Sequence, residues 1–136
     1  MKKIIISGSS RLVEKVEYWV NYFKEKGYEV LDYPKYIGEV DETDDYDKHM
    51  EKVYNEYYRN LEKTDVYFLM NEGKNGIDGY IGSSAISELT YVVVQNLIHD
   101  KKTEIYILKM PSKEQGCYEE VSFWLNKGWI KLYEEK

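Results

Sequence analysis

The sequence predicts an α/β fold: a doubly wound, Rossmann-like or flavodoxin-like parallel sheet of about five strands, flanked by helices. Two observations predict it. Short apolar runs without polar alternation, such as Lys3 to Ser7, are typical of strands covered on both faces of a parallel sheet. These runs alternate along the chain with segments whose apolar residues recur at helical spacing. That alternation is the pattern of successive βαβ units.

Each element is bounded by a local signal. Lys3 to Ser7 (KIIIS) is a β-branched run and gives the first strand. The next segment, from about Arg11 to Lys26, has apolar residues every three or four positions and is a helix that stops at Gly27. Tyr28 to Tyr33 is the second strand, which Pro34 closes.

The rest of the chain continues the alternation. After an acidic connection, a second helix ends near Lys63 or Thr64, and its apolar face is formed by Met50, Val53, Tyr54, Tyr57 and Leu61. The same signals then predict, in chain order, a strand over 65–71, a helix to about 100, a strand over 103–109, a helix over 114–126 and a short strand over 129–133.

Length and charge exclude several classes of protein. The chain has 136 residues, and we expect a single domain over residues 1–136. A formal net charge of -6 offers no basic face to a phosphate backbone, so we expect no nucleic-acid partner. No apolar run is long enough for a signal peptide or a membrane span, which predicts a cytoplasmic protein without a membrane partner. Cys117 is the single cysteine, so it cannot form an internal disulfide.

The stretch from Gly79 to Leu89, GYIGSSAISEL, combines features of a ligand site. We expect Ser83 or Ser84 to cap a helix, whose free N–H groups and positive dipole end favour an anion or a polar ligand. Glu88 follows about one helical turn later, so a carboxylate lies close to an anion-binding helix end. The alternative is a capped surface helix with a solvated glutamate.

A second polar segment, GSSR, follows the first strand. Gly8 permits a tight turn, Ser9 and Ser10 offer hydroxyls and Arg11 offers a bidentate fork, which together suit a phosphate. Ligands bind at the carboxyl ends of the strands in such a sheet, so this loop, the region after the second strand and the loop over 72–84 should meet there. The alternative is a turn and cap without a ligand. GxGxxG and GK[ST] are both absent, and we expect no cofactor.

Three motifs occur together over roughly residues 3 to 109: GSSR after the first strand, Thr64-Asp65 before an apolar third strand, and GYIG followed by a glutamate inside a helix. Together they resemble the nucleoside 2-deoxyribosyltransferase superfamily. The GSxR loop is similar to that of its deoxynucleoside 5′-monophosphate N-glycosidase branch. The resemblance implies that Glu88 is the nucleophile that attacks the anomeric carbon of the sugar. It also implies that Ser9 and Arg11 hold the 5′-phosphate, and that the chain forms a dimer or higher homo-oligomer with sites completed across the interface.

The chain departs from that family at two positions. Members usually have an Asp eight residues before the Asp that opens the third strand, where this chain has Tyr57. Many have a Tyr two residues before the first glycine, where this chain has Ile6. Tyr57 either stacks on a base or donates a hydrogen bond to the ligand, or it packs with its own helix. Asp78 is a candidate to replace a loop carboxylate of some relatives, or it is a turn residue.

Other polar clusters are not assigned to a site. An acidic run does not match the EF-hand pattern and is expected to form a solvated loop or a mobile lid; it comprises Glu39, Asp41, Glu42, Asp44, Asp45 and Asp47. His49 and His99 lack partners at metal-ligand spacing, so we expect no metal site. The helix after Glu88 is apolar around most of its circumference, which is typical of a central helix or a subunit interface.

We therefore expect an enzyme that cleaves the N-glycosidic bond of a (deoxy)nucleoside or its 5′-monophosphate, by hydrolysis or by base transfer through a carboxylate nucleophile. Glu88 is the catalytic candidate, and the substrate-binding candidates are Gly8, Ser9, Ser10, Arg11, Tyr57, Asp78, Gly79, Gly82, Ser83 and Ser84. One alternative is an N-glycosidase of a ribonucleotide or an NAD-like dinucleotide. Another is a non-catalytic nucleotide-binding or sensing protein.

Overall fold

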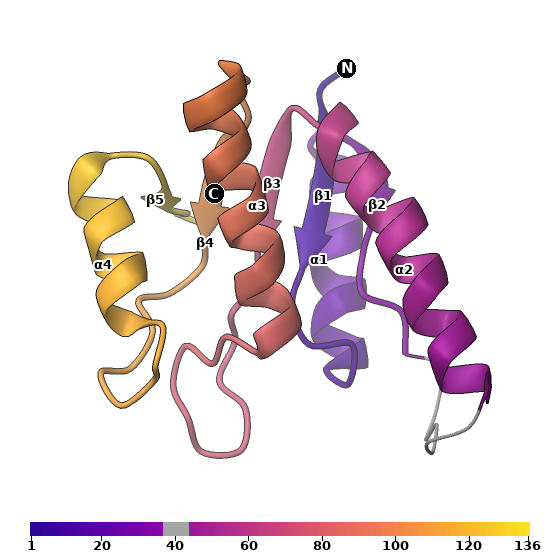
Figure 1. The fold of residues 1–136 in the computed structure, drawn as a ribbon, viewed down its shortest axis with the longest axis horizontal. Helices are drawn as coiled ribbons and strands as arrows, with labels where there is room; N and C mark the ends of the chain where they lie inside the picture. Colours follow the sequence, from indigo (N-terminus) through magenta and orange to yellow (C-terminus); the bar gives the residue numbers. More distant parts are fainter. Residues whose placement is uncertain (37–43) are drawn as a thin grey trace.

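The structure is a computed structural model that describes residues 1–36 and 44–136, apart from the side chains of residues 44 and 45. Strands and helices alternate along the chain (Figure 1). In order they are β1 (Lys3–Ser7), α1 (Val13–Glu25), β2 (Glu29–Asp32), α2 (Asp44–Lys63), β3 (Val66–Leu69), α3 (Ser83–His99), β4 (Glu104–Ile107), α4 (Tyr118–Lys127) and β5 (Lys131–Leu132). All nine predicted elements are therefore present. The ends of most of them differ from the expected ends by one to four residues.

The five strands form one sheet in the order β2-β1-β3-β4-β5, and every neighbouring pair is parallel. This confirms the doubly wound α/β prediction, and the strand order is that of flavodoxin-like folds. The chain changes direction across the sheet between β1 and β3, which makes their carboxyl ends the expected ligand position. The loops that follow β1, β3 and β4 gather at the lower edge in Figure 1.

Two cores lie on opposite faces of the sheet. One face is covered by α1, and the other by α2, α3 and α4 (Figure 1). Alternate residues of β1 divide between these faces, because successive side chains of a strand point in opposite directions. Ile4 and Ile6 pack with Trp19 and Phe23 of α1, whereas Ile5 packs in the core that includes Leu89 of α3. The sheet is thus apolar on both faces, as the uninterrupted apolar run predicted.

The second helix begins earlier than its apolar pattern suggested. Asp44, Asp45 and Asp47 belong to α2, so the expected acidic loop is wrong for this part of the run. Acidic residues are favoured in the first turn of a helix, because its dipole is positive there. Glu39, Asp41 and Glu42 lie outside the described residues.

Tyr54 does not belong to the apolar face predicted for α2. Its side chain is 58% exposed and stacks on the ring of Tyr58, with 5.3 Å between the ring centroids. Tyr57 and Leu61 are buried, as that face predicted. Tyr54 therefore stands at the exposed flank of the helix, and its packing prediction is wrong.

α3 begins differently from the expectation. Its N-cap is Gly82, and no side chain caps it, so Ser83 and Ser84 are the first helical residues instead of the cap. Gly82 has an extended backbone with φ of −75° and ψ of 169°, the conformation that an N-cap normally has. The first N–H groups of α3 are thereby left without a side-chain partner from the cap.

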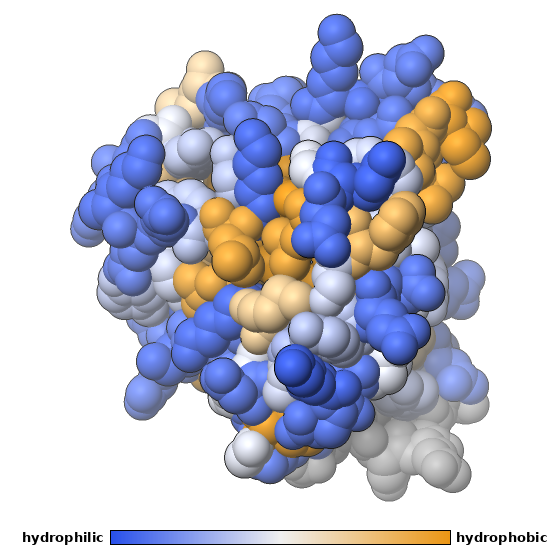
Figure 2. Space-filling view, turned by 90° about the vertical axis from the view of Figure 1, so that its left-hand side faces the viewer, coloured by the Kyte–Doolittle hydropathy of each residue, from blue (hydrophilic) through white to orange (hydrophobic). Residues whose placement is uncertain are grey.

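The carboxyl half of α3 exposes apolar residues to solvent. Ile98 is 67% exposed, and Val94 and Leu97 are also exposed. Figure 2 shows apolar side chains gathered on the side of the molecule formed by α4 and the neighbouring part of α3, where Phe123 is exposed as well. The apolar character of α3 is therefore explained by burial only along one side. No helix in the described part of the chain is long and apolar enough to cross a membrane.

Candidate functional site

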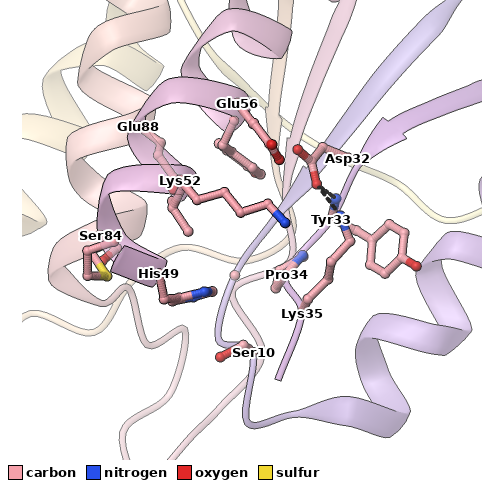
Figure 3. A pocket seen from close by; sticks show the side chains of 14 residues that line it. Ser10, Asp32, Tyr33, Pro34, Lys35, His49, Lys52, Glu56, Ser84 and Glu88 are labelled. Atoms are coloured by element: carbon pink, nitrogen blue, oxygen red, sulfur yellow. Dashed lines mark hydrogen bonds and ion pairs between the residues drawn. The ribbon is translucent and has the colours of Figure 1, made fainter. Parts of the chain in front are cut away.

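A cavity of about 360 Å³ lies at the carboxyl ends of β1 and β2, between those strands and helices α2 and α3 (Figure 3). It opens where the topology predicted a ligand site. Glu88 is part of its wall, and so are residues from the first loop, the end of β2 and one side of α2. The complete lining is Gly8, Ser10, Asp32, Tyr33, Pro34, Lys35, His49, Met50, Lys52, Val53, Glu56, Tyr57, Ser84 and Glu88.

Glu88 and Asp32 are the two buried acids in this wall, whereas Glu56 is exposed. The Glu88 side chain projects from the second turn of α3, and the residue is only 9% exposed. The Ser7 hydroxyl donates a hydrogen bond to Glu88 Oε1 at 2.6 Å. The pKa of Glu88 is raised to about 7 as the net result of three effects: burial raises it, the Ser7 hydrogen bond lowers it and the negative charge of Asp32 raises it. The solvated-glutamate alternative is therefore wrong.

Two buried tyrosines are close enough to Glu88 for its charge to act on them. Tyr57 donates its hydroxyl proton to the carbonyl oxygen of Ile6 at 2.9 Å, and its ring packs in the same core as Leu61. The Tyr67 hydroxyl has no hydrogen-bond partner within the described parts of the chain. Burial, followed by the charge of Glu88, raises the pKa of both phenols well above 10, so both remain neutral. Tyr57 lines the cavity, but its hydroxyl is already bonded to the backbone.

A second cavity, of about 240 Å³, lies between the first loop and the start of α3. We call it the cradle, and its lining is Gly8, Ser9, Ser10, Arg11, Lys74, Tyr80, Gly82, Ser83, Ser84 and Ala85. It brings together most of the predicted substrate-binding residues. Three of them, Gly8, Ser10 and Ser84, also line the Glu88 cavity, so the two cavities adjoin.

The cradle combines donors that suit an anion. Ser9 Oγ accepts a hydrogen bond from Lys74 Nζ at 3.0 Å and one from the backbone N–H of Arg11 at 3.4 Å. The hydroxyl proton of Ser9 is therefore left to donate to a ligand. The Arg11 guanidinium lies 5.8 Å from the ring centre of Tyr36. The N-terminus of α3 adds backbone N–H groups and its positive dipole end.

Lys74 reaches the cradle because its loop folds back as a tight turn. Lys74 and Ile77 exchange two backbone hydrogen bonds of 3.1 and 3.0 Å, and Asn75 and Gly76 between them have positive φ values. Asn-Gly is the preferred pair for such a turn. The Lys74 ammonium also lies 5.2 Å from the ring centre of Tyr80. The tight turn between Lys74 and Ile77 therefore gives this loop a defined shape, which places the Lys74 side chain at the cradle.

Close packing and a positive φ explain two of the predicted glycines. Gly8 has a φ of +152°, and a Cβ atom there would lie 2.7 Å from Cγ of Met70. Gly79 has a φ of +61°, and a Cβ atom there would lie 2.4 Å from the carbonyl oxygen of Met110. Gly8 lines both cavities, whereas Gly79 lines neither. The role of Gly79 in the structure is to fit the loop against the residues after β4.

Asp78 is also outside both cavities. Its side chain is 80% exposed and lies 4.0 Å from the ammonium of Lys109. Its carbonyl oxygen accepts hydrogen bonds from the Ser112 N–H and from Gln115 Nε2, at 3.2 Å each. The structure therefore does not bring Asp78 together with Glu88, and its position is that of a loop residue.

Several residues of the site were not predicted as members of it. Ser7 and Asp32 are the last residues of β1 and β2, and Lys74 lies in the loop over 72–84, in which the predicted candidates begin only at Asp78. His49 was considered only as a metal ligand, but it lines the Glu88 cavity with Lys52 and Glu56 of the same helix. Their spacing of three and four residues was a usable signal, because it places all three on one side of α2.

Among the described residues, no group of three or more histidine, cysteine, aspartate or glutamate side chains is arranged to hold a metal ion. Cys117 is half-buried and forms no disulfide. Comparison with protein-family models, with curated proteins and with solved structures gives no match to this chain.

Proposed function

We propose that the protein cleaves the N-glycosidic bond of a nucleoside 5′-monophosphate or a nucleoside, with Glu88 as the nucleophile. One observation carries the proposal: a largely buried carboxylate lines a cavity that adjoins a cradle of hydroxyls, cations and helix N–H groups. A phosphate in the cradle and a sugar beside Glu88 would use both cavities at once. The resemblance to the nucleoside 2-deoxyribosyltransferase superfamily supports the same assignment.

The chemistry requires an ionised carboxylate beside the anomeric carbon. Cleavage of the bond between that carbon and the base nitrogen develops oxocarbenium character on the sugar. Glu88 Oε1 is occupied by the Ser7 hydrogen bond, so we assign Oε2 as the atom that forms the new bond to carbon. Water then displaces the carboxylate in a hydrolase, or a second base does so in a transferase. In both cases Glu88 is regenerated.

The leaving base must gain a proton as the bond breaks. His49 lines the same cavity as Glu88, and Figure 3 shows its ring directed inward from α2. An imidazole in that position is suited to protonate the leaving nitrogen. The phosphate in the cradle takes no part in bond breaking, and its binding energy serves to position the sugar.

A non-catalytic nucleotide-binding protein is the second candidate. Tyr57 replaces the helix Asp of the family, and its hydroxyl donates to the Ile6 carbonyl. No carboxylate is therefore available at that position to help orient the sugar and base. A protein that kept the cradle and lost turnover would have these same features.

Release of free base distinguishes the two candidates. Wild type, Glu88→Gln and the control Glu119→Gln are incubated with nucleosides, their 5′-monophosphates in both sugar forms, and NAD, and the products are separated by chromatography. Glu119 is exposed in the first turn of α4 and lines neither cavity. We expect release by wild type and the control, and a loss of at least about 1,000-fold in Glu88→Gln. Nucleotide binding without release by any protein would overturn the glycosidase and leave the binding protein.

Self-association is part of the same proposal, because the family assembles as dimers or higher oligomers. The exposed residues Val94, Leu97 and Ile98 of α3 offer an apolar surface for it. Light scattering of wild type and of Ile98→Lys tests this point. A wild-type mass of one chain at all concentrations would contradict it.

A further inference from the structure

Asp32 is a buried acid that the proposed chemistry leaves without a role. It ends β2, is 8% exposed and lines the cavity that contains Glu88. Its neighbours on the sheet place it there: the register between β1 and β2 shifts at Ile5, so that Asp32 stands opposite that residue. Its charge is close enough to Glu88 to raise the pKa of that carboxyl. A buried carboxylate is costly unless hydrogen-bond donors or cations surround it.

Three donors from the protein fix the Asp32 carboxylate. Oδ1 accepts from the Tyr33 N–H at 2.9 Å and from Lys35 Nζ at 3.0 Å, as Figure 3 shows, and Oδ2 accepts from Asn60 Nδ2 at 3.0 Å. A carboxylate offers about four acceptor positions. Within the described part of the chain, one position on Oδ2 therefore remains for a further donor, and the other contacts hold the group in one orientation.

The position of this acceptor relative to Glu88 and the cradle indicates what the donor is. A nucleotide with its phosphate in the cradle and its anomeric carbon at Glu88 would extend its sugar into the Glu88 cavity, whose wall includes Asp32. The 2′-hydroxyl is on the carbon next to the anomeric carbon, so it is the ring hydroxyl nearest to Glu88, in the cavity whose wall Asp32 shares. An acid at the end of the second strand also binds ribose hydroxyls in dinucleotide-binding folds of this architecture.

We propose that Asp32 accepts a hydrogen bond from the 2′-hydroxyl, so that the ligand is a ribonucleoside 5′-monophosphate and not its 2′-deoxy counterpart. The inference rests on the proposed function for the placement of the sugar, and it changes the sugar class that the family resemblance implies. A 2′-deoxynucleotide would leave the free position of a buried carboxylate unfilled, and it would bind more weakly for that reason.

The test compares ligands first, so that it does not depend on a variant that fails to fold. Calorimetry with Glu88→Gln, which does not consume the ligand, measures binding of AMP, GMP, CMP and UMP and of their 2′-deoxy, 3′-deoxy and 2′-O-methyl forms. For the base that binds best, we expect the 2′-deoxy and 2′-O-methyl forms to bind about 10-fold or more weakly than the parent. The 3′-deoxy form should bind like the parent, because it keeps the 2′-hydroxyl.

A protein variant then assigns the effect to Asp32. Asp32→Asn should reduce the difference between the ribo and 2′-deoxy forms to less than about 3-fold, while the control Asp78→Asn keeps it. Equal binding of both sugar forms to the protein with Asp32 would overturn the inference, whether or not the wild type releases base. Discrimination by sugar without any base release from the wild type would instead overturn the proposed function and leave the Asp32 inference standing.

Discussion

Ser7 at the end of β1 donates a hydrogen bond to Oε1 of Glu88 in α3, at 2.6 Å and across 81 residues of sequence. Both side chains are almost completely buried. Burial raises the pKa of Glu88, whereas this contact lowers it, because a donor stabilises the ionised carboxylate. The net pKa is about 7. The balance between these two effects decides how much of the proposed nucleophile is ionised at neutral pH.

Base release should therefore depend on pH in a defined direction. Only the ionised form of Glu88 attacks carbon, and its pKa is about 7, so kcat/KM should rise with pH below about 7. The increase should approach tenfold per pH unit below that value. Initial rates from about pH 5 to about pH 9 measure it. A rate that is constant from pH 5 to pH 7 would contradict the assignment of Glu88.

Replacing Ser7 should shift that profile. Ser7→Ala removes the hydrogen bond that lowers the pKa of Glu88, so the pKa should move above 7 and the rate at pH 7 should fall by about 5- to 10-fold. Ser87→Ala is the control, since the Ser87 hydroxyl donates to the Ser83 carbonyl oxygen on the exposed side of the same helix. NMR titration of labelled glutamate carboxyls reads the pKa without any turnover. The same midpoint in wild type and Ser7→Ala would exclude a role for Ser7 in setting it.

Glu88 should also make folding stability depend on pH. Its pKa is raised from 4.5 to about 7, so the folded state holds a proton that the unfolded state has lost between these values. Stability should fall as the pH rises from about 4.5 to about 7. Glu88→Gln removes this cost and should increase the free energy of unfolding by about 2 to 3 kcal/mol at pH 8, with little effect at pH 4.5. Urea denaturation at both pH values measures it, and an equal effect at both would argue against the raised pKa.

The fold was predictable from the sequence because it depends on local patterns. The predicted strand over Lys3 to Ser7 coincides with β1 residue for residue, since its centre, Ile4 to Ile6, is buried on both faces and is apolar throughout. The cap of α3 was missed because Gly82 is the residue with the extended backbone of an N-cap, whereas Ser83 and Ser84 are already helical. Ends of elements depend on single backbone angles, which spacing does not encode.

The site was predictable only where one segment supplies it. Glu88 and the first loop were found because each occurs in a short motif at the end of a strand or the start of a helix. Ser7 and Asp32 were not found, because they are functional candidates only through contacts between β1, β2 and α3. Lys74 was missed for the same reason: its partner Ser9 is 65 residues away. Strand order and register determine these contacts.

Lys74 should strengthen binding of a phosphate in the cradle. Lys74→Met removes an ammonium that bonds Ser9 Oγ, so affinity for a nucleoside 5′-monophosphate should fall by about 10-fold, while affinity for the matching nucleoside stays the same. Lys109→Met is the control, because Lys109 lies beside Asp78 and lines neither the cradle nor the Glu88 cavity. Calorimetry with AMP and adenosine, or the pair with the base that binds best, measures the difference. An equal loss for nucleotide and nucleoside would show that Lys74 does not contact the phosphate.

Gly79 should be required for the loop that leads into α3. Gly79→Ala would place a methyl group 2.4 Å from the Met110 carbonyl oxygen and would also strain a backbone with φ of +61°. Gly76→Ala is a matched control, because Gly76 has a φ of +76° but nothing lies within 4 Å of its Cβ position. The left-handed conformation alone costs about 1 kcal/mol in both variants, and the contact should add about 2 kcal/mol or more in Gly79→Ala. Denaturant unfolding of the two variants measures the difference, and equal stabilities would mean that the loop moves away from Met110 without cost.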